Sequence, residues 1–189
     1  MTKTNKLPKK AKRVFKGEIY EVWQWPQKMF DGSVAAFEML KRPDTAQVIP
    51  IVDDKILILS QAQPNRPKPF LSLAGGRREK GETPLNAAKR ELLEETGYVS
   101  RDWKLWHSVN PVHKIVWTVY TYIARDCLYW QPPQSDAGEK ISAKLIGFEE
   151  FLALADEPDF YESELANYLL RARCDKKEYK KLHQLMFNK

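Results

Sequence analysis

The chain has 189 residues, of which 43% are hydrophobic, and a formal net charge of +6. These values fit one globular domain, with or without a small appended subdomain, that is long enough to bury a core. The sequence has no run of eighteen apolar residues and no apolar segment behind its N-terminal lysines, so it predicts neither a membrane span nor a secretory signal. Cys127 and Cys174 have no metal-ligand spacing, and we expect both to be reduced thiols of a cytoplasmic protein.

Basic residues gather at the two ends of the chain. Six lie within residues 3–13, and six more lie within residues 171–181. Such clusters can mark a nucleic-acid interface, but a flexible tail over residues 1–12 and a solvated helix face explain them without a partner. We therefore expect no nucleic-acid partner. A basic surface would also suit a polyanionic nucleotide substrate.

The first predicted structure is an antiparallel β extension over residues 13–43. β-Branched and aromatic residues over 14–25 are typical of a strand. Asp31-Gly32 is a hairpin signal, so residues 32–41 should return antiparallel to that strand.

The core is predicted over residues 44–157, and helices that pack on it over residues 158–189. Near-continuous apolar runs indicate two strands, at 45–52 and 55–61, that are covered on both faces. Three prolines make residues 63–70 a loop. Further strands are predicted at 71–74, 103–109, 115–124 and 139–148, and helices at 83–97, 148–154, 160–172 and 175–187.

Residues 83–97 have the start and stop signals of a helix. Thr83 can cap its N-terminus, Pro84 suits the first helical position, and Gly97 can end it in a left-handed conformation. At about 100° per residue, one stripe of this helix is apolar and should pack inward. The stripe contains Leu85, Ala88 and Leu92.

Three glutamates, Glu91, Glu94 and Glu95, gather on another face of the same helix. Like charges three and four residues apart destabilise a helix by roughly 0.2–0.5 kcal/mol per pair. Three acidic residues alone are most often a solvated surface, but a cation over the cluster would relieve the repulsion. A site made only of oxygen ligands suits Mg²⁺ or Mn²⁺.

The spacing of residues around these glutamates resembles the signature of the Nudix hydrolases. That signature is Gly, five residues, Glu, seven residues, Arg-Glu, an apolar residue, any residue, Glu-Glu, any residue, Gly. Chance would match its seven fixed positions about once in 10⁸ registers. The matching residues are Gly76, Glu82, Arg90, Glu91, Glu94, Glu95 and Gly97. The resemblance implies an α/β/α sandwich with a mixed central sheet, preceded here by the N-terminal antiparallel extension.

The opening of the chain also resembles the Nudix subgroup that cleaves ADP-ribose and related nucleotide sugars. In that subgroup an N-terminal sheet helps to form a swapped dimer and part of the nucleotide pocket, which implies a homodimer here. The chain departs from the subgroup at two places. Ser72-Leu73-Ala74-Gly75 stands in place of Glu-Leu-Pro-Ala, and Gln63 stands where an arginine is often found, so Arg66 would have to reach back from the loop.

The resemblance assigns roles to the motif residues. Glu91 and Glu95 are expected to bridge divalent metal ions, with the backbone carbonyl of Gly75 as a further ligand. Glu94 would complete the acidic face, either as a ligand or by holding a metal-bound water. Glu82 would pair with Arg90 and fix the loop to the helix.

Two further parts of the site are implied by the subgroup. Its catalytic base is a carboxylate from the loop near the last core strands, where Glu139 is the first match and Asp136 the second, unless both belong to an ordinary acidic surface loop. The nucleobase is expected to stack on an aromatic residue. Trp23, Trp25 and Phe30 of the opening hairpin are candidates, and the alternative for each is a core or dimer-interface residue.

The sequence thus predicts a Mg²⁺- or Mn²⁺-dependent pyrophosphohydrolase that cleaves a nucleotide sugar such as ADP-ribose to AMP and a sugar phosphate. Other diphosphate substrates remain open, namely dinucleotide coenzymes, nucleoside triphosphates and capped RNA. A Nudix regulator that binds a nucleotide without cleaving it is a further alternative. The intact acidic cluster argues against the regulator.

Overall fold

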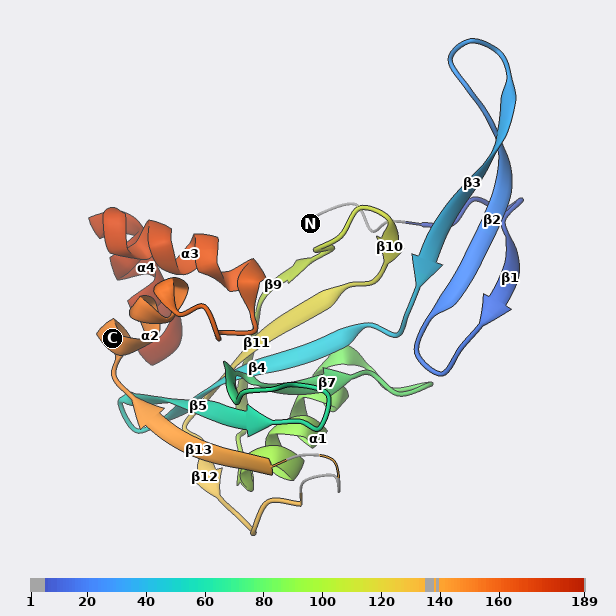
Figure 1. Cartoon of the computed structure of the whole chain (residues 1–189). Helices are drawn as coiled ribbons and strands as arrows, with labels where there is room; N and C mark the ends of the chain where they lie inside the picture. The colour runs from blue at the N-terminus through green and yellow to red at the C-terminus, as the bar shows by residue number, and fades with distance from the viewer. Residues whose placement is uncertain (1–5, 135–137, 139, 189) are drawn as a thin grey trace.

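A seven-stranded sheet forms the middle of the molecule in the computed structural model, which describes residues 6–134, 138 and 140–188 (Figure 1). Its strand order is β13-β5-β4-β11-β9, with β6 beside β5 and β7 beside β4. Because β4 runs parallel to β11 and antiparallel to β7, the sheet is mixed, as predicted. The strands are β4 (Thr45–Val52), β5 (Lys55–Ala62), β6 (Phe70–Ser72), β7 (Ala74–Arg77), β9 (Asp102–Val109), β11 (Val119–Arg125) and β13 (Lys140–Ile146).

Helices cover both faces of this sheet (Figure 1). Helix α1 (Pro84–Thr96) packs on β4 and β7 from one side. The other side is covered by α2 (Phe148–Ala153), the short 3₁₀ helix η1 (Leu154–Asp156), α3 (Ser163–Cys174) and α4 (Lys176–Phe187). Each face has its own apolar core, so the predicted α/β/α sandwich is confirmed.

The alternation of side chains along β5 shows how one strand serves both cores. Ile56 and Ile58 join the core under the C-terminal helices, whereas Leu57 and Leu59 join the core under α1. Gln61 continues the second set, because residues two apart in a strand share a face. The polar end of β5 therefore lies on the α1 side of the sheet.

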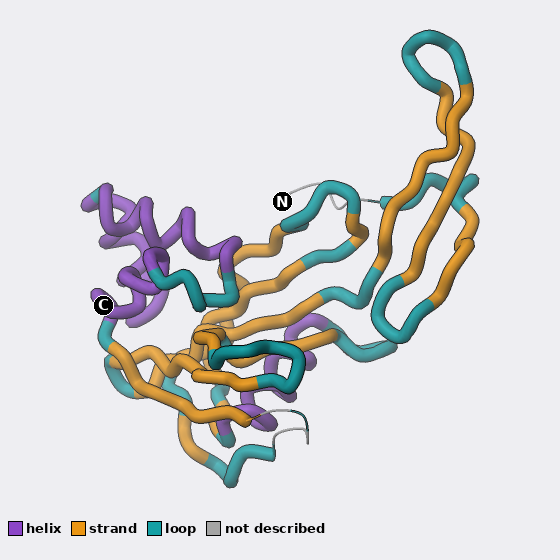
Figure 2. Tube along the Cα trace, in the orientation of Figure 1, coloured by secondary structure: helices purple, strands orange, loops and turns teal. Residues whose placement is uncertain are grey.

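The N-terminal extension is a separate four-stranded sheet that projects from the core (Figure 2). Asp31-Gly32 lies in the turn between its second and third strands, as predicted, and Gly32 has a φ of 87°. The strand predicted over residues 14–25 is instead broken by a turn, in which the Gly17 N–H donates to the Tyr20 carbonyl. The strands, in sheet order, are β1 (Lys12–Lys16), β2 (Glu21–Lys28), β3 (Val34–Lys41) and β10 (Ile115–Val116).

The strand predicted over residues 115–124 is also divided. β10 pairs in parallel with β3 of the extension, and β11 pairs in parallel with β4 of the core. Between them, the Trp117 indole donates to Thr45 Oγ1 and the Thr118 N–H donates to Asp44. These hydrogen bonds interrupt the ladder, so one apolar run of sequence supplies strands to two sheets.

The segment before α3 is extended rather than helical. The Leu71 N–H donates to the Asp159 carbonyl, and the Tyr161 N–H donates to the Leu71 carbonyl. Residues 159–161 therefore run beside β6, and the helix predicted from residue 160 begins at Ser163. Two short strands that the sequence did not predict, β8 (Tyr98–Val99) and β12 (Leu128–Tyr129), pair after the end of α1.

Both cysteines are free thiols, as expected. Cys127 is buried, which raises the pKa of its thiol to about 12, and Cys174 is exposed. Over the part of the chain that the structure describes, no helix has the length and apolar character needed to cross a bilayer.

Candidate active site

Helix α1 begins and ends as its sequence predicts. The Thr83 side chain accepts a hydrogen bond from the Asn86 N–H, Pro84 is the first helical residue, and Gly97 ends the helix with a φ of 74°. Leu92 is fully buried against the sheet, so the apolar stripe packs inward. The face that carries the glutamates consequently lies along β7.

Glu95 is the most enclosed of the three glutamates, with 8% of its surface exposed. One of its carboxylate oxygens accepts a 2.7 Å hydrogen bond from the Gly75 N–H, and the other lies 3.4 Å from the Gln61 amide nitrogen. These contacts hold Glu95 between the end of β5 and the start of β7. Gly75, whose carbonyl the sequence predicts as a metal ligand, is thus in direct contact with Glu95.

Arg90 joins the other two glutamates to the loop that precedes the helix. Its Nη1 donates to Glu91 Oε1 and to Glu94 Oε2, both at 2.9 Å. Its Nε and Nη2 donate to the two carboxylate oxygens of Glu82 at 3.2 and 3.3 Å, and Nη2 also donates to the Arg77 carbonyl. One guanidinium therefore compensates three carboxylates of the motif.

This network sets the charge of Glu82 and Arg90. Burial alone would raise the pKa of the Glu82 carboxyl, but hydrogen bonds from Arg90 and from the Glu79 N–H outweigh it and hold that pKa below its ordinary value. Burial likewise acts to lower the pKa of Arg90, and its carboxylate partners raise it instead. Both groups are therefore charged at neutral pH.

Two adjacent glycines let β7 approach its neighbours closely. A Cβ on Gly76 would lie 2.4 Å from Glu91 Oε1. A Cβ on Gly75 would lie 2.7 Å from the Ala46 carbonyl oxygen of β4. A side chain at Gly76 would displace Glu91, and a side chain at Gly75 would displace the backbone of β4. This explains why both positions of β7 next to the acidic helix face are glycines.

The profile of the NUDIX domain family matches residues 41–166 of the chain, which include the acidic helix and all of the glycines and charges described above. The chain belongs to the NUDIX family. The predicted resemblance is confirmed, and with it a fold in which the acidic helix is packed against the mixed sheet.

Individual relatives match different shares of the chain. The chain is 23% identical to the ADP-ribose pyrophosphatase of Bacillus subtilis (strain 168) over 160 residues, which are 82% of this chain and 85% of that protein. It is 29% identical to the methanol dehydrogenase activator of Bacillus methanolicus over 54% of this chain and 57% of that protein. A crystal structure of an ADP compounds hydrolase has the same fold, with a TM-score of 0.71, 22% identity and coverage of 85% of this chain and 89% of that chain.

The oxygen groups of the Nudix site fit a divalent cation of the Mg²⁺ type. Three carboxylates and the Gly75 carbonyl would supply only oxygen ligands, and the missing Cβ of Gly76 leaves room for Glu91 against the strand. Glu91 and Glu94 both bond Arg90 in this structure. Within the described residues, no three acidic, histidine or cysteine side chains are gathered in ligand geometry.

Glu162 is a buried acid near this Nudix site that the sequence did not single out. Only 4% of its surface is exposed; Oε1 accepts a 3.0 Å hydrogen bond from the Leu73 N–H, and Oε2 has no partner among the described residues. Burial raises its pKa well above the ordinary value, and the charges of Glu164 and Glu95 act in the same direction. It lies 67 residues after Glu95 in the sequence, so no local spacing could connect the two.

The loop with the two predicted base candidates starts and ends near the Nudix helix. On one side the Gln134 N–H donates to the Glu94 carbonyl at 2.7 Å. On the other side Lys140 pairs with Ala62 of β5, next to Gln61. Asp136 and Glu139 themselves lie outside the described residues.

The aromatic residues predicted to stack on the nucleobase differ in their contacts and exposure within the N-terminal sheet. The Trp23 indole donates to Glu21, and Trp25 is buried beside Phe37 with ring centroids 5.1 Å apart. Phe30 is fully exposed in the turn between β2 and β3, at the far end of the projecting sheet (Figures 1 and 2). Trp25 therefore packs within the extension and Phe30 lies in its exposed turn, and their part in nucleobase binding stays a prediction.

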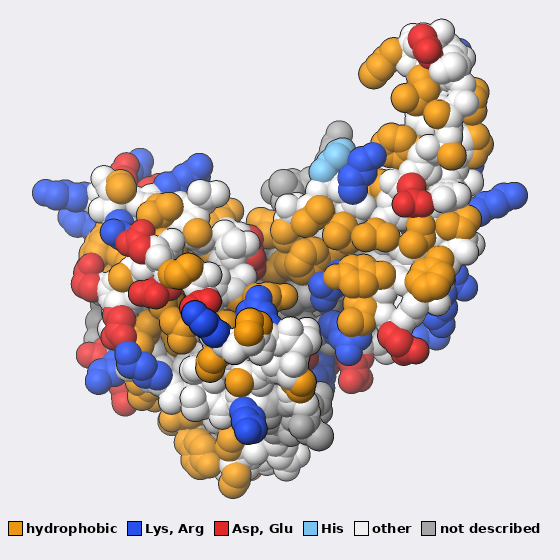
Figure 3. All heavy atoms as spheres, viewed as in Figure 1, with side chains coloured by type: hydrophobic (Ala, Val, Ile, Leu, Met, Phe, Trp, Pro, Cys, Tyr) orange, Lys and Arg blue, Asp and Glu red, His pale blue; other side chains and the backbone are white. Residues whose placement is uncertain are grey.

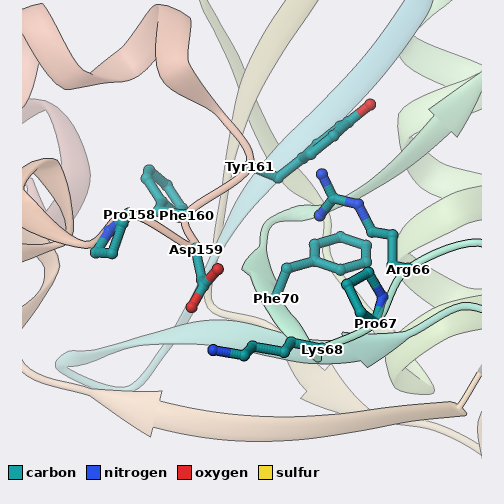
Figure 4. Close-up of a pocket in the computed structure, with 8 residues that line it drawn as sticks. All are labelled: Arg66, Pro67, Lys68, Phe70, Pro158, Asp159, Phe160 and Tyr161. Carbon is teal, nitrogen blue, oxygen red and sulfur yellow. The ribbon is translucent and has the colours of Figure 1, made fainter.

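Arg66 lies in a turn of the proline-rich loop, and its side chain reaches the aromatic residues Phe70 and Tyr161. Its N–H donates to the Gln63 carbonyl in a turn, which folds the loop toward the segment before α3. Its guanidinium carbon lies 4.2 Å from the Phe70 ring centroid and 5.1 Å from the Tyr161 ring centroid. All three side chains line a pocket of about 470 Å³, which Figure 4 shows in close-up.

Proposed function

We propose that this Nudix protein hydrolyses the diphosphate of an ADP-linked compound, with ADP-ribose as the first candidate, and releases AMP and a sugar phosphate. Membership of the family makes the chain a hydrolase of diphosphate bonds. The substrate is supported by similarity to an ADP-ribose pyrophosphatase over most of both chains. The observation that carries the proposal is the complete acidic network of α1, in which Glu95 contacts Gly75 and Arg90 gathers Glu91 and Glu94.

The metal-binding roles are assigned to the residues that the motif predicts. Glu91, Glu95 and the Gly75 carbonyl are the proposed ligands of Mg²⁺ or Mn²⁺, and Glu94 is a further ligand or a hydrogen-bond partner of the attacking water. When bound, the cation neutralises charge on the phosphoryl oxygens and lowers the pKa of water. Glu91 and Glu94, which bond Arg90 in this structure, would hold the cation, and the two oxygens of Glu82 would hold Arg90.

The attacking water also needs a base, for which we propose Glu139 first and Asp136 second. The proposal is supported by the two described ends of their loop. The Gln134–Glu94 hydrogen bond joins one end to α1, and the Lys140–Ala62 pair joins the other to the end of β5. A carboxylate supplied by this loop would act as the general base toward the attacking water.

We propose that the protein acts as a homodimer in the cytoplasm, joined through the N-terminal sheet. Figure 3 shows apolar side chains along the projecting strands, among which Phe15, Phe30 and Val34 are exposed. Exposed apolar patches of this kind mark interaction surfaces. A partner's hairpin laid on this surface would let Trp23 take part in the nucleotide site of the other subunit.

The test of the proposed activity is incubation of the purified protein with ADP-ribose and Mg²⁺, followed by chromatography of the nucleotides. We expect AMP and ribose 5-phosphate in equal amounts, and no release when the Mg²⁺ is chelated. Binding of ADP-ribose without turnover would instead support the regulator that the sequence leaves open. Removal of residues 1–12 is expected to leave the rate unchanged, because the basic tail has no assigned role.

A panel of diphosphates separates the remaining substrates. ADP-ribose, a dinucleotide coenzyme, a nucleoside triphosphate and a capped RNA would be compared at equal concentration by the rate at which products form. We expect the ADP-sugar to be cleaved with the largest kcat/KM. A larger kcat/KM for capped RNA would overturn the substrate assignment and give the basic termini a function.

A further inference from the structure

Phe70, which lines the pocket around Arg66, projects on the same face of the sheet as the Nudix helix. Phe70 pairs directly with Gln61 in the antiparallel β5–β6 ladder, and directly opposed side chains project on one face. Gln61 contacts Glu95 on that face. Leu71, the next residue after Phe70, packs in the opposite core under the C-terminal helices. Gln61 is therefore next to both Phe70 of the pocket and Glu95 of the acidic helix.

The segment before α3 completes the pocket by the same alternation. Residues 159–161 run in parallel beside β6, and Phe160 joins the core under the C-terminal helices together with Leu71. Tyr161 must then project on the α1 side. Its ring centroid lies 5.5 Å from that of Phe70, and 60% of Tyr161 is exposed. Tyr161 thus presents a partly exposed aromatic ring beside Phe70.

Positive charge accompanies this aromatic surface. Arg66 lies over both rings, and Lys68 lines the same pocket (Figure 4). In the described part of the chain, neither cation has a carboxylate within ion-pair distance, although Asp159 lies at the pocket wall. The pocket volume of about 470 Å³ falls within the range of about 300–1,000 Å³ that is typical of small-molecule sites.

We propose that this pocket binds the nucleoside monophosphate half of the substrate, with the base stacked on Tyr161 and the phosphate nearer Arg66 and Lys68. The inference rests on the proposed diphosphate hydrolysis and names which half of the substrate lies on this side of the metal ions. An exposed aromatic ring can stack on a nucleobase, and two cations without an ion-pair partner in the described part of the chain can bind a phosphate. Asp159 supplies an acceptor for a ribose hydroxyl or an exocyclic amine.

The direct test is the affinity of AMP in the presence of Mg²⁺, measured by calorimetry on the full chain and independently of turnover. Tyr161→Ala should weaken AMP binding about tenfold, because one base–ring stack is lost. Tyr161→Phe keeps the ring and should bind AMP as the native protein does. Tyr129→Ala is the matched control, since Tyr129 is 58% exposed on β12 and should leave the affinity unchanged.

Ribose 5-phosphate is the second probe, because it represents the other half of the substrate. Its affinity should be the same in the native protein and in Tyr161→Ala. If Tyr161→Ala weakens ribose 5-phosphate and not AMP, the pocket holds the sugar phosphate and the inference is wrong. If it weakens neither, the pocket is not a substrate site. A failure of the proposed hydrolysis would be seen separately, as AMP binding that depends on Tyr161 without any turnover of ADP-ribose.

Trp23→Ala tests the competing location of the base in the N-terminal sheet. We expect it to change AMP affinity less than Tyr161→Ala does. A larger loss in Trp23→Ala, together with native affinity in Tyr161→Ala, would move the base to the hairpin of a partner subunit and overturn the assignment.

Discussion

Helix α1 and the N-terminal sheet differ in how far their side chains find partners within the same chain. On α1, Arg90 bonds three carboxylates and Glu95 accepts from the Gly75 backbone, so the charged groups have partners within a few residues or across one strand. In the N-terminal sheet, Phe15 and Val34 are exposed and β1 is an edge strand. The charged groups of α1 thus find partners within one chain. The N-terminal sheet instead exposes apolar side chains and the backbone hydrogen-bonding groups of an edge strand, which a second protein chain could cover.

Among substitutions in these two regions, we expect the largest loss of activity at Glu95 of α1. Glu95→Gln keeps the size of the side chain and an acceptor for the Gly75 N–H, but it removes the negative charge proposed to bind the cation. We expect kcat for ADP-ribose to fall on the order of 10³-fold, because the cation supplies several kcal/mol of transition-state stabilisation. Glu178→Gln, on the exposed side of α4, should retain the native rate, and circular dichroism should show that both variants are folded. Native turnover by Glu95→Gln would refute its role as a ligand.

A second prediction concerns the apolar surface of the N-terminal sheet. Phe15→Glu combined with Val34→Glu places charges where we expect a partner chain, and burying an unpaired charge is strongly unfavourable. We expect the dimer dissociation constant to rise at least about 100-fold, measured by light scattering over a concentration series. A native protein that is monomeric at every concentration would contradict the proposed dimer, and the same two substitutions would then have no effect on mass.

The Glu82–Arg90 contact should affect stability more than chemistry. Glu82→Gln removes a charge that receives two hydrogen bonds from Arg90, and hydrogen bonds to charged groups contribute about 1.5–3 kcal/mol. Because both side chains are partly exposed, we expect the free energy of unfolding to fall by about 2 kcal/mol in urea denaturation. The neighbouring exposed Glu79→Gln should change it by less than about 0.5 kcal/mol. Equal values for the two variants would show that the contact does not stabilise the fold.

The smallest expected effect is at Glu162, a buried acid whose second carboxylate oxygen has no hydrogen-bond partner among residues 6–134, 138 and 140–188. Its raised pKa means that the folded protein keeps a proton that the unfolded chain loses near pH 4.5, so stability should fall as the pH rises above that value. Glu162→Gln cannot ionise and still accepts from the Leu73 N–H. We expect it to be more stable than the native protein by about 1 kcal/mol or more at pH 8, with little difference at pH 4. Parallel stability curves for the two proteins between pH 4 and pH 8 would contradict this.

Much of α1 could be predicted because its determinants are local. Thr83 and Gly97 act on backbone groups within four residues, and the pairing of Arg90 with Glu94 follows from one turn of helix. The same holds for the turn at Asp31-Gly32. Strand breaks were harder to foresee, since the division of residues 115–124 depends on hydrogen bonds from Trp117 and Thr118 to Thr45 and Asp44, about seventy residues earlier.

The sequence by itself determined the family, the acidic helix and the residues proposed to bind metal, because a fixed spacing along one helix carries that chemistry. Only the tertiary structure decided that Tyr161 and Phe70 meet beside Gln61, that Glu162 is buried against Leu73, and that Phe30 stands far from the site of its own chain. Those relations depend on which strands lie side by side and on which face each residue falls. A β-strand places consecutive residues on opposite faces, so the neighbours of a side chain are set by pairing across the sheet rather than by distance along the chain.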